Sequence, residues 1–458
     1  MNIVLLIADQ LRYDCVSGEF PVNTPNLDRL ASEGVFFKHA FTPMPVCAPA
    51  RQCLASGKMA DSFGGFWNYD MKGLPCKSLI TDGSTWSNHL EQSGYSTAFL
   101  GKWHTSETQG PQDFGYTHSV NNSIWAKHVE EKYPGYSYKK GFDGEESFLA
   151  LEDSHPHFMA KKAVEFMTDF ADAPFFIRLD YNDPHLPCRP SKPFSEMYKK
   201  EDAVPWASFG DKFIGKPYIQ KQMVKNWGNE NRSWDEWSET VARYYAMISQ
   251  VDDSAGMILN AIDENGLRDN TLVIFTSDHG DTCGGHGMMD KHYILYDDNC
   301  RVPLIIRCPG GAAGLKSDAF VSNMLDIPPT IEEICGLTPS GVGIEERHGM
   351  SLLPILKGKE QPERDDFAVS SSNGQQFGFY SNRTIRTAKW RYVWNLTDVD
   401  ELYNHDNDPG ELNNLAAEPG YADILRELRM KLYNKLISYN DPFACGWVKT
   451  QLTEGSKY

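Results

Sequence analysis

Strand-like apolar runs alternate with helical patterns through about residue 350, and this alternation is the feature that most limits the fold of the chain. The apolar runs lie at residues 2–8, 95–101, 173–183, 270–280 and 302–310. Residues 24–34, 157–170 and 240–266 have the spacing of helices. Continuous apolar strands that alternate with helices form parallel sheets covered on both faces. We therefore predict an α/β fold with a large, mostly parallel sheet sandwiched by helices.

The pattern changes after residue 358, where the polar stretch EQPERDD precedes a segment rich in strand-forming residues. That segment, FAVSSSNGQQFGFYSNRTIRTAKWRYVWN, is followed by a loop and by a last helical pattern near residues 420–438. About 100 residues is an ordinary size for a minor domain. We predict a large domain over residues 1–360 and a smaller C-terminal α+β domain with an antiparallel sheet over residues 361–458.

Charge and hydropathy exclude several classes of partner. The formal net charge of −18 argues against nucleic acid, whose phosphates the chain would repel. No apolar run is long enough to span a bilayer, so no membrane partner is expected. An anionic ligand would need a local cluster of cations that overcomes the negative charge of the whole chain.

The N-terminus and the cysteines bear on the compartment. The stretch MNIVLLIADQ lacks the basic segment and the cleavage site of a secretory signal, and it is interpreted as a buried strand. The ten cysteines show no paired spacing, which is typical of free thiols in a reducing compartment. We expect a cytoplasmic protein, while the sequence leaves its oligomeric state open.

Polar side chains follow several of the predicted strands at the point where each strand ends. Two of these groups are acid-containing doublets, Asp9-Gln10 and Asp278-His279. An acid after one strand is more often a turn or cap residue than a ligand, but two doublets at separate strand ends are more informative. In such sheets ligands bind at the carboxyl ends of the strands. Two carboxylates with an amide and an imidazole would suit a divalent cation that prefers oxygen ligands.

Cationic side chains also gather at strand ends and in the adjacent loops. They are Arg51, Lys102, His104, His185 and Lys291. Any one of them alone is more simply explained as a solvated surface charge. Five of them in an acidic chain indicate an anion site.

The stretch PVCAPARQCLASG at residues 45–57 poses a separate question, because Cys47 precedes a predicted helix that starts near Pro49. The N-terminus of that helix points at residue 47 and favours negative charge there. Cys47 is therefore a buried thiol, a thiolate nucleophile or the precursor of another group. A peptidase-like pairing of cysteine and histidine lacks support, because a hard-cation site prefers oxygen to sulfur. Cys53, on the same helix, is expected to be a buried core thiol.

At this point the motifs resemble a family. CAPAR fits the C-x-P-x-R signature of the formylglycine-dependent sulfatases, which belong to the alkaline phosphatase superfamily. Other stretches typical of that family follow in its usual order: IADQ, TPNLDRLASEGVFF, GKWH, YNDPH, FTSDHGD, HGMMDKHYILYDDNCRVPLII and DELYNHDNDPGELNNLA. The resemblance covers nearly the whole chain. It implies an alkaline-phosphatase-like fold, a catalytic domain over residues 1–360 and a C-terminal subdomain over residues 361–458 that completes the active-site cleft.

The resemblance implies a metal site made by Asp9, Gln10, Asp278 and His279, with residue 47 completing the ligand shell. It also implies that a maturation enzyme converts Cys47 to formylglycine, which is hydrated to a diol. One hydroxyl of the diol would attack sulfur, and loss of a proton from the other would then release sulfate. Calcium is the metal that the family implies, whereas manganese or zinc would suit the imidazole better.

The resemblance assigns roles to the cations as well. Arg51 would bind the hydroxyl of residue 47, and His104 would act as the base that releases sulfate. Lys102, His185 and Lys291 would bind the sulfate oxygens, and His185 or Lys291 would protonate the leaving oxygen. Preorganised cations and a metal stabilise the charge that builds up on these oxygens.

Three positions depart from the pattern of many sulfatases. Gln10 stands where an aspartate is usual, His279 where an asparagine is usual, and Ala50 where a serine is usual. These residues resemble those of the phosphonate monoester hydrolases and choline-sulfatases. The main hypothesis is a sulfuric ester hydrolase, and the alternative is a phosphonate monoester or phosphodiester hydrolase on the same scaffold. A non-catalytic binding protein would require an unmodified Cys47 or broken metal ligands.

A small sulfated carbohydrate, a mono- or oligosaccharide, is the substrate that we expect. Trp67 and Asn68 follow the nucleophile helix and offer an aromatic face and an amide to a sugar ring. Packing of Trp67 under a loop is at least as plausible. In the C-terminal domain, Arg386, Trp390 and Arg391 are candidates for the rim of the cleft, and Arg386 is included in the predicted substrate site.

Overall fold

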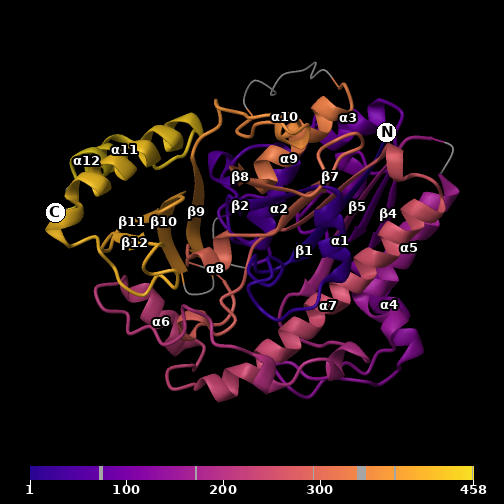
Figure 1. Ribbon diagram of the computed structural model, residues 1–458, viewed down its shortest axis with the longest axis horizontal. Helices are drawn as coiled ribbons and strands as arrows, with labels where there is room; N and C mark the ends of the chain where they lie inside the picture. Colours follow the sequence, from indigo (N-terminus) through magenta and orange to yellow (C-terminus); the bar gives the residue numbers. More distant parts are fainter. Residues whose placement is uncertain are drawn as a thin grey trace.

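The protein is described by a computed structural model that covers residues 1–71, 76–170, 173–291, 293–337, 347–375, 378–455 and 457. Its largest element is an eight-stranded sheet with the strand order β4-β3-β5-β1-β6-β7-β2-β8 (Figure 1). The strands are β1 Asn2–Asp9, β2 Val35–Phe41, β3 Ser96–Gly101, β4 His118–Asn121, β5 Phe175–Pro184, β6 Thr271–Ser277, β7 Leu304–Arg307 and β8 Leu315–Ser322. Only β7 runs antiparallel to its neighbours in the sheet. The prediction of a large, mostly parallel sheet is confirmed.

Helices cover both faces of this sheet because its central strands are apolar on both sides. Every residue of β1 is buried, and alternate side chains of the strand enter two different hydrophobic cores. One core contains side chains of α2 Cys47–Ser56, α3 Trp86–Gln92 and α9 Asn323–Ile334. The other contains side chains of α1 Pro25–Glu33, α5 His155–Asp169 and α7 Trp234–Glu264. The predicted sandwich of helices around the sheet is therefore present.

Shorter elements complete the large part of the chain. The remaining helices there are α4 Asn122–Lys132, α6 Tyr218–Asn226, α8 Asp297–Cys300 and α10 Leu353–Leu356. Short 3-10 segments occur at Ala60–Phe63, Pro111–Phe114, Leu151–Asp153, Phe194–Glu196, Lys200–Asp202, Arg268–Asn270 and Gly285–Gly287, and one more, Pro419–Tyr421, lies in the C-terminal part. None of the described helices combines the length and the apolarity needed to cross a bilayer.

The C-terminal part contains a four-stranded antiparallel sheet with the order β12-β11-β10-β9. Its elements are β9 Phe367–Gln375, β10 Gly378–Thr387, β11 Trp390–Asn395, β12 Glu401–Asn404, α11 Ala422–Ser438 and α12 Gly446–Glu454. In Figure 1 these elements lie together on one side of the main sheet. The predicted antiparallel sheet is confirmed, whereas the domain boundary at residue 360 stays a prediction.

Strand β9 supports the segment that leads into α2. The hydroxyl of Ser370 donates to the carbonyl of Thr42 at 2.6 Å, and the backbone N–H of Ser371 donates to the carbonyl of Pro43 at 2.9 Å. The C-terminal sheet thereby holds the backbone a few residues before Cys47 and helps to fix the position of the candidate nucleophile.

Candidate active site

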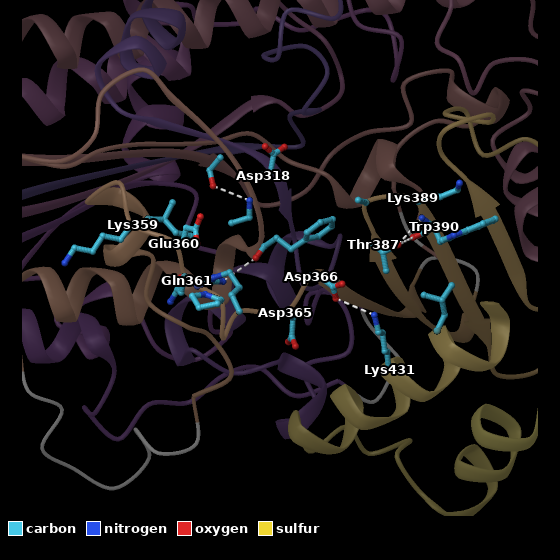
Figure 2. Close-up of a pocket in the computed structure, with 18 of the residues that line it drawn as sticks. Asp318, Lys359, Glu360, Gln361, Asp365, Asp366, Thr387, Lys389, Trp390 and Lys431 are labelled. Atoms are coloured by element: carbon cyan, nitrogen blue, oxygen red, sulfur yellow. Dashed lines mark hydrogen bonds and ion pairs between the residues drawn. The ribbon is translucent and has the colours of Figure 1, made fainter. Parts of the chain in front are cut away.

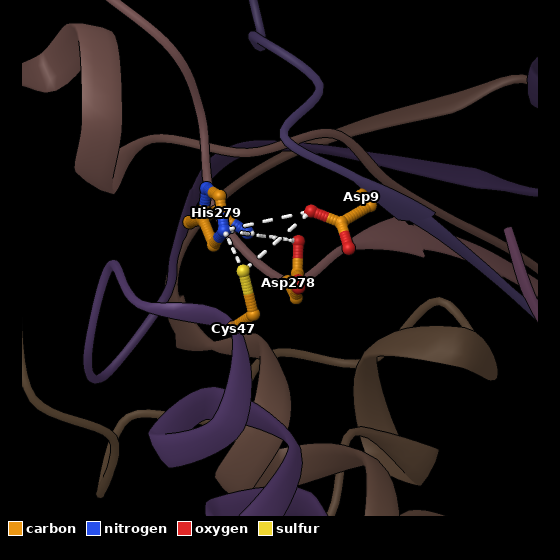
Figure 3. A group of neighbouring side chains, drawn as sticks. All are labelled: Asp9, Cys47, Asp278 and His279. Atoms are coloured by element: carbon orange, nitrogen blue, oxygen red, sulfur yellow. Dashed lines mark hydrogen bonds and ion pairs between the residues drawn. The ribbon is translucent and has the colours of Figure 1, made fainter. Parts of the chain in front are cut away.

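The ends of the central strands bring the two acid-containing doublets together. Asp9 is the last residue of β1, and Asp278 and His279 follow β6, which pairs with β1 in parallel. Cys47 is the first residue of α2 and faces the same edge of the sheet. One ligand atom from each of these four buried residues lies within 4.8 Å of those of the others (Figure 3). The structure thus places side chains from three distant parts of the chain in one cluster.

The donor atoms of the cluster converge on one another. The Sγ atom of Cys47 lies 3.1 Å from Nε2 of His279 and 3.7 Å from Oδ1 of Asp9. His279 Nε2 also lies 3.7 Å from Oδ1 of Asp9 and 3.7 Å from Oδ1 of Asp278. His279 Nδ1 lies 2.8 Å from the carbonyl of Gly280, which only accepts, so Nδ1 carries the hydrogen. The lone pair of Nε2 is left for the cluster, as a metal-binding histidine requires.

Arg51 occupies the opposite oxygens of the two aspartates. Its guanidinium pairs with Oδ2 of Asp278, and its Nη2 lies 3.4 Å from Oδ2 of Asp9. Its Nε donates to Oδ2 of Asp180 at 3.1 Å, and Asp180 also accepts two hydrogen bonds from Arg178. The Oδ1 atoms of Asp9 and Asp278 remain directed at His279 and Cys47. Two carboxylate oxygens, one imidazole nitrogen and the side chain of residue 47 therefore fit a divalent cation.

Asp180 is a residue that the sequence analysis missed. It lies on β5 within FFIRLDYND, where Arg178 and Asp180 are two charged residues on the same face of a strand that begins with three apolar residues. That pair was the available signal, because unpaired charges are rarely buried in such a strand. The contact between Arg51 and the hydroxyl of residue 47 stays a prediction, since in this structure Arg51 binds three carboxylates.

Lys102 reaches the cluster because of the glycine before it. Gly101 has a φ of +94°, and a Cβ atom at this position would lie 1.9 Å from the carbonyl oxygen of Asp180. That same oxygen accepts the backbone N–H of Lys102 at 2.9 Å. The Lys102 ammonium donates to Oδ2 of Asp9. Only glycine allows this close approach of β3 and β5, so Gly101 fixes the position of the lysine.

His185 and Lys291 form a second cationic group next to the cluster. Lys291 Nζ lies 2.7 Å from His185 Nε2, 2.8 Å from Gln10 Oε1 and 3.1 Å from Asp290 Oδ1. His185 Nδ1 lies 2.6 Å from the carbonyl of Leu186 and therefore carries the hydrogen, so Nε2 accepts from the ammonium. Gln10 thus touches the site through Lys291, and its backbone has the uncommon φ of 70°. Such backbone strain is concentrated at functional sites.

His104 lies beside Asp70, a second residue that the sequence analysis missed. His104 Nε2 is 3.5 Å from Oδ1 of Asp70, and the ring of Tyr69 stacks edge-on against the imidazole at 5.2 Å. Burial lowers the pKa of His104, but its contacts with Asp70 and Cys47 raise it above the ordinary value. Asp70 lies two positions after Asn68, one of the predicted sugar contacts, but nothing local marks it as a partner of His104.

The surroundings of Cys47 favour negative charge. Burial alone would raise the pKa of its thiol, but the charges of Lys102, Lys291 and His279, with a contact to His104, hold that pKa well below its ordinary value. Burial and the charge of Cys47 would raise the pKa of Asp9, but the charges of Lys102 and Arg51 hold that pKa below its ordinary value. The site therefore stabilises an anionic group at residue 47 and attracts further negative charge.

The three predicted substrate-binding residues all make contacts within the protein. Trp67 is fully buried and packs edge-on against the ring of Phe379, so it offers no free face for sugar stacking. Asn68 Oδ1 accepts the backbone N–H of Ala48 at 2.9 Å and so caps the first turn of α2. Arg386 is buried against Asp297, with its Nε 3.2 Å from Oδ1. The structure gives these residues structural contacts, and their role at a sugar stays a prediction.

Asp297 also belongs to a second group of potential ligands, with His405 and Glu411. Arg391 forms ion pairs with both Asp297 and Glu411, and Arg386 adds another positive charge. The two carboxylates are therefore already neutralised by guanidinium groups. We interpret this group as a junction between α8 and the C-terminal sheet.

A cavity of about 800 Å³ lies away from this chemistry. It is bounded by β8, the segment after α10 and helix α11, and Asp318, Lys359, Trp390 and Lys431 are among its lining residues (Figure 2). Trp390, a candidate for the rim of the cleft, lines it, but none of the predicted catalytic or metal-binding residues does. Its volume alone does not make it the active site, because it lacks a cluster of convergent catalytic groups.

Comparison with known proteins identifies the family. Residues 1–337 match the family model described as Sulfatase. The chain belongs to the sulfatase family. Residues 284–437 of this sulfatase also match a model described as the C-terminal part of N-sulphoglucosamine sulphohydrolase. The protein is a sulfuric ester hydrolase, and the prediction of this enzyme class is confirmed.

Individual relatives span nearly the whole sulfatase. An arylsulfatase of Clostridium perfringens is 28% identical over 492 residues, which cover 97% of this chain and 96% of the relative. The N-acetylglucosamine-6-O-sulfatase of Bacteroides thetaiotaomicron is 25% identical over 510 residues, which cover 96% of this chain and 87% of the relative. The crystal structure of the phosphonate monoester hydrolase of Agrobacterium radiobacter superposes with a TM-score of 0.80 at 24% identity and 96% coverage of both chains. This last likeness confirms the alkaline-phosphatase-like fold.

Proposed function

We propose that this sulfatase hydrolyses the sulfate ester of a small sulfated carbohydrate and releases inorganic sulfate. The observation that carries the proposal is the meeting of Cys47 with two buried aspartates and a histidine, beside Lys102 and Lys291. A sulfuryl group that bridges residue 47 and these cations would be held by charges already in place, which stabilises its transition state. The sugar is supported by the activity named for the Bacteroides relative.

Formylglycine is proposed at position 47, made from Cys47 by a maturation enzyme that acts on the CAPAR stretch. When present, the hydrated aldehyde supplies a hydroxyl nucleophile in place of sulfur. Residue 47 begins α2, and the hydrogen bond from the Ala48 backbone N–H to Asn68 holds the first turn of that helix in place. His104, which contacts residue 47, is proposed to accept a proton at its imidazole when sulfate leaves.

Lys102, His185 and Lys291 are proposed to bind the sulfuryl oxygens. Lys102 holds Asp9 and Lys291 holds Gln10, so both ammonium groups are fixed before substrate arrives. His185 Nε2 accepts a hydrogen from Lys291, so a proton can pass from the ammonium to the imidazole or directly to the leaving oxygen. Groups fixed in this way lose little freedom on reaching the transition state.

A divalent cation, calcium, is proposed at this site, where Asp9, Asp278, His279 and residue 47 would hold it, with Gln10 as the remaining predicted ligand. Oxygen donors outnumber the single imidazole, which favours a hard cation. Bound there, the cation would supply positive charge that stabilises the anionic form of the reacting group.

Removal of the metal tests this assignment. Dialysis against EDTA is expected to abolish hydrolysis of an aryl sulfate, and Ca²⁺ is expected to restore it. Because the cation binds the folded site, it should also raise the thermal unfolding midpoint in a concentration-dependent way. Rates and midpoints would be measured with Ca²⁺, Mn²⁺ and Zn²⁺ in parallel. Better recovery with Mn²⁺ or Zn²⁺ would show that calcium is wrong, and undiminished activity after chelation would remove the cation from the proposal.

Phosphonate monoester or phosphodiester hydrolysis is the second candidate. Gln10 and His279 favour it because both residues lie at the site and depart from the usual sulfatase pattern toward that of the phosphonate monoester hydrolases. The fold shared with the Agrobacterium phosphonate monoester hydrolase accommodates either chemistry.

Parallel assays separate the two candidates. We expect kcat/KM for 4-nitrophenyl sulfate to exceed that for 4-nitrophenyl phenylphosphonate by at least about tenfold, or roughly 1.4 kcal/mol in transition-state stabilisation. Both substrates release the same chromophore, so the rates are directly comparable. Phosphonate turnover that exceeds sulfate turnover by orders of magnitude would reverse the order of the two candidates.

A reducing compartment such as the cytoplasm is proposed for the enzyme. Its support is chemical: all ten cysteines are free thiols in the structure.

A further inference from the structure

A smaller cavity, of about 300 Å³, has two lining residues in common with the active site. Lys102 and His185, both proposed to bind the sulfuryl group, line it. The cavity continues away from them between the end of β5, helix α7 and the segment near Tyr138. A group attached to a sulfate that is held by Lys102 and His185 can therefore extend into this space. Its volume is at the lower end of the range for small-molecule sites.

Asp183 supplies a buried acceptor in this cavity. The residue is 8% exposed, and within the described residues no donor makes a hydrogen bond to its carboxylate. Its nearest polar neighbour, His155 Nδ1, lies 3.7 Å from Oδ2. That nitrogen accepts the backbone N–H of Asn182 at 3.3 Å, while His155 Nε2 donates to Asn122 at 3.0 Å. His155 therefore has no hydrogen to offer Asp183, and a buried carboxylate without a donor needs an explanation.

Gln250 and Arg189 supply donors in the same cavity. Gln250 is 1% exposed, and its Oε1 accepts the backbone N–H of Ser191 at 2.8 Å. This bond orients the amide and leaves both hydrogens of Nε2 without a partner within the described residues. Arg189 lies 3.9 Å above the ring of Tyr138, and in the described part its guanidinium donates only at 3.4 Å, to the carbonyl of Lys140. Donors and an acceptor thus line one small space.

We propose that this cavity binds the sugar ring that carries the sulfate, with ring hydroxyls donating to Asp183 and accepting from Gln250 and Arg189. The inference rests on the proposed function and names the part of the protein that selects the carbohydrate. A hydroxyl both donates and accepts, so neighbouring hydroxyls match this mixed lining, whereas an aryl group would leave the polar atoms unsatisfied. Burial and the charge of Asp9 raise the pKa of Asp183 to about 7, which adds a donor at neutral pH and fits an uncharged polyol.

The test compares two sulfate esters in the wild-type holoenzyme and in Asp183→Ala and Gln250→Ala. The substrates are N-acetylglucosamine 6-sulfate, which has ring hydroxyls, and 4-nitrophenyl sulfate, which has none. In each variant we expect kcat/KM for the sugar sulfate to fall about 10- to 100-fold further than that for the aryl sulfate, mainly through KM, because a lost hydrogen bond leaves polar groups unpaired. Asp183→Asn, which keeps the shape and one acceptor, should fall between the wild type and the alanine variant.

A matched control is Asp365→Ala, which removes a carboxylate from the distant large cavity and should change neither rate. Thermal unfolding midpoints identify any variant that is misfolded. Because Gln250 and Asp183 lie on different elements, the test can be completed with one of the two variants if the other does not fold. Equal losses on both esters, or no loss on the sugar ester, would overturn the inference and leave sulfatase activity standing. A wild-type enzyme active only on the aryl ester would overturn both the inference and the carbohydrate substrate, and one inactive on both esters would overturn the proposed function itself.

Discussion

Cys47→Ala is expected to lower the rate of sulfate ester hydrolysis by about 10,000-fold or more, because removal of a covalent nucleophile leaves only binding and charge stabilisation. Initial rates with 4-nitrophenyl sulfate measure the effect. Peptide mass spectrometry over residues 45–57 of the wild type should show an aldehyde in place of the thiol in the active fraction. The fraction of converted residue 47 should scale with the specific activity of the preparation.

Cys53→Ala is the matched control, because it removes a second buried thiol from the same helix. Cys53 Sγ accepts the backbone N–H of Ala60 at 3.2 Å, and burial raises the pKa of this thiol. We expect this variant to keep its activity and to lose about 1 kcal/mol of stability. Full activity in Cys47→Ala would refute a nucleophile at that position. An active wild-type enzyme in which residue 47 remains a thiol would refute the formylglycine step.

Arg51→Met is expected to lower the free energy of unfolding by about 3–5 kcal/mol and to abolish activity. The guanidinium is fully buried and binds Asp9, Asp180 and Asp278, so its removal leaves buried carboxylates without their shared counter-charge. Methionine keeps most of the side-chain volume, which separates the loss of charge from the loss of packing. Urea unfolding at pH 7 in the presence of EDTA measures the effect without a metal that compensates for the charge.

Two further variants make this prediction specific. Arg51→Lys keeps the charge but not the planar fork that reaches three carboxylates, so its stability should lie between those of the wild type and Arg51→Met. The double variant Arg51→Met with Asp180→Asn should lose less stability than the sum of the losses in the two single variants, because the second change removes one of the unpaired buried charges. A loss below about 1 kcal/mol in Arg51→Met would mean that water or protons relieve the buried charge.

Much of the site was predictable because its residues lie in short sequence motifs. Asp9, Asp278 and His279 follow apolar strands directly, and parallel strand ends must meet at one edge of the sheet. Cys47 and Arg51 stand four residues apart in CAPAR and share one helix. The alternation of strands and helices predicted the main sheet for the same reason, since burial on both faces leaves a periodic apolar pattern.

Other residues were not predictable, because their partners are remote. Asp180 meets Arg51 across 129 positions, and Asp183 lines a cavity whose donors come from α7 and the loop after β5. Trp67 was considered for sugar stacking because it is aromatic and near the nucleophile helix. Its full burial depends on the packing of Phe379, more than 300 positions away, which no local pattern indicates.

The sequence by itself determined the family, the order of the strands and helices along the chain, and the types of side chain at the strand ends, because these depend on residue spacing over a few turns or strands. Only the tertiary structure decided how those side chains divide their contacts. It turned one oxygen of Asp9 and Asp278 toward Arg51 and the other toward His279, and among the described residues it left Asp183 without a donor. Such divisions depend on distances of a few ångströms between segments far apart in the chain, and the packing of the sheet and its helices sets those distances.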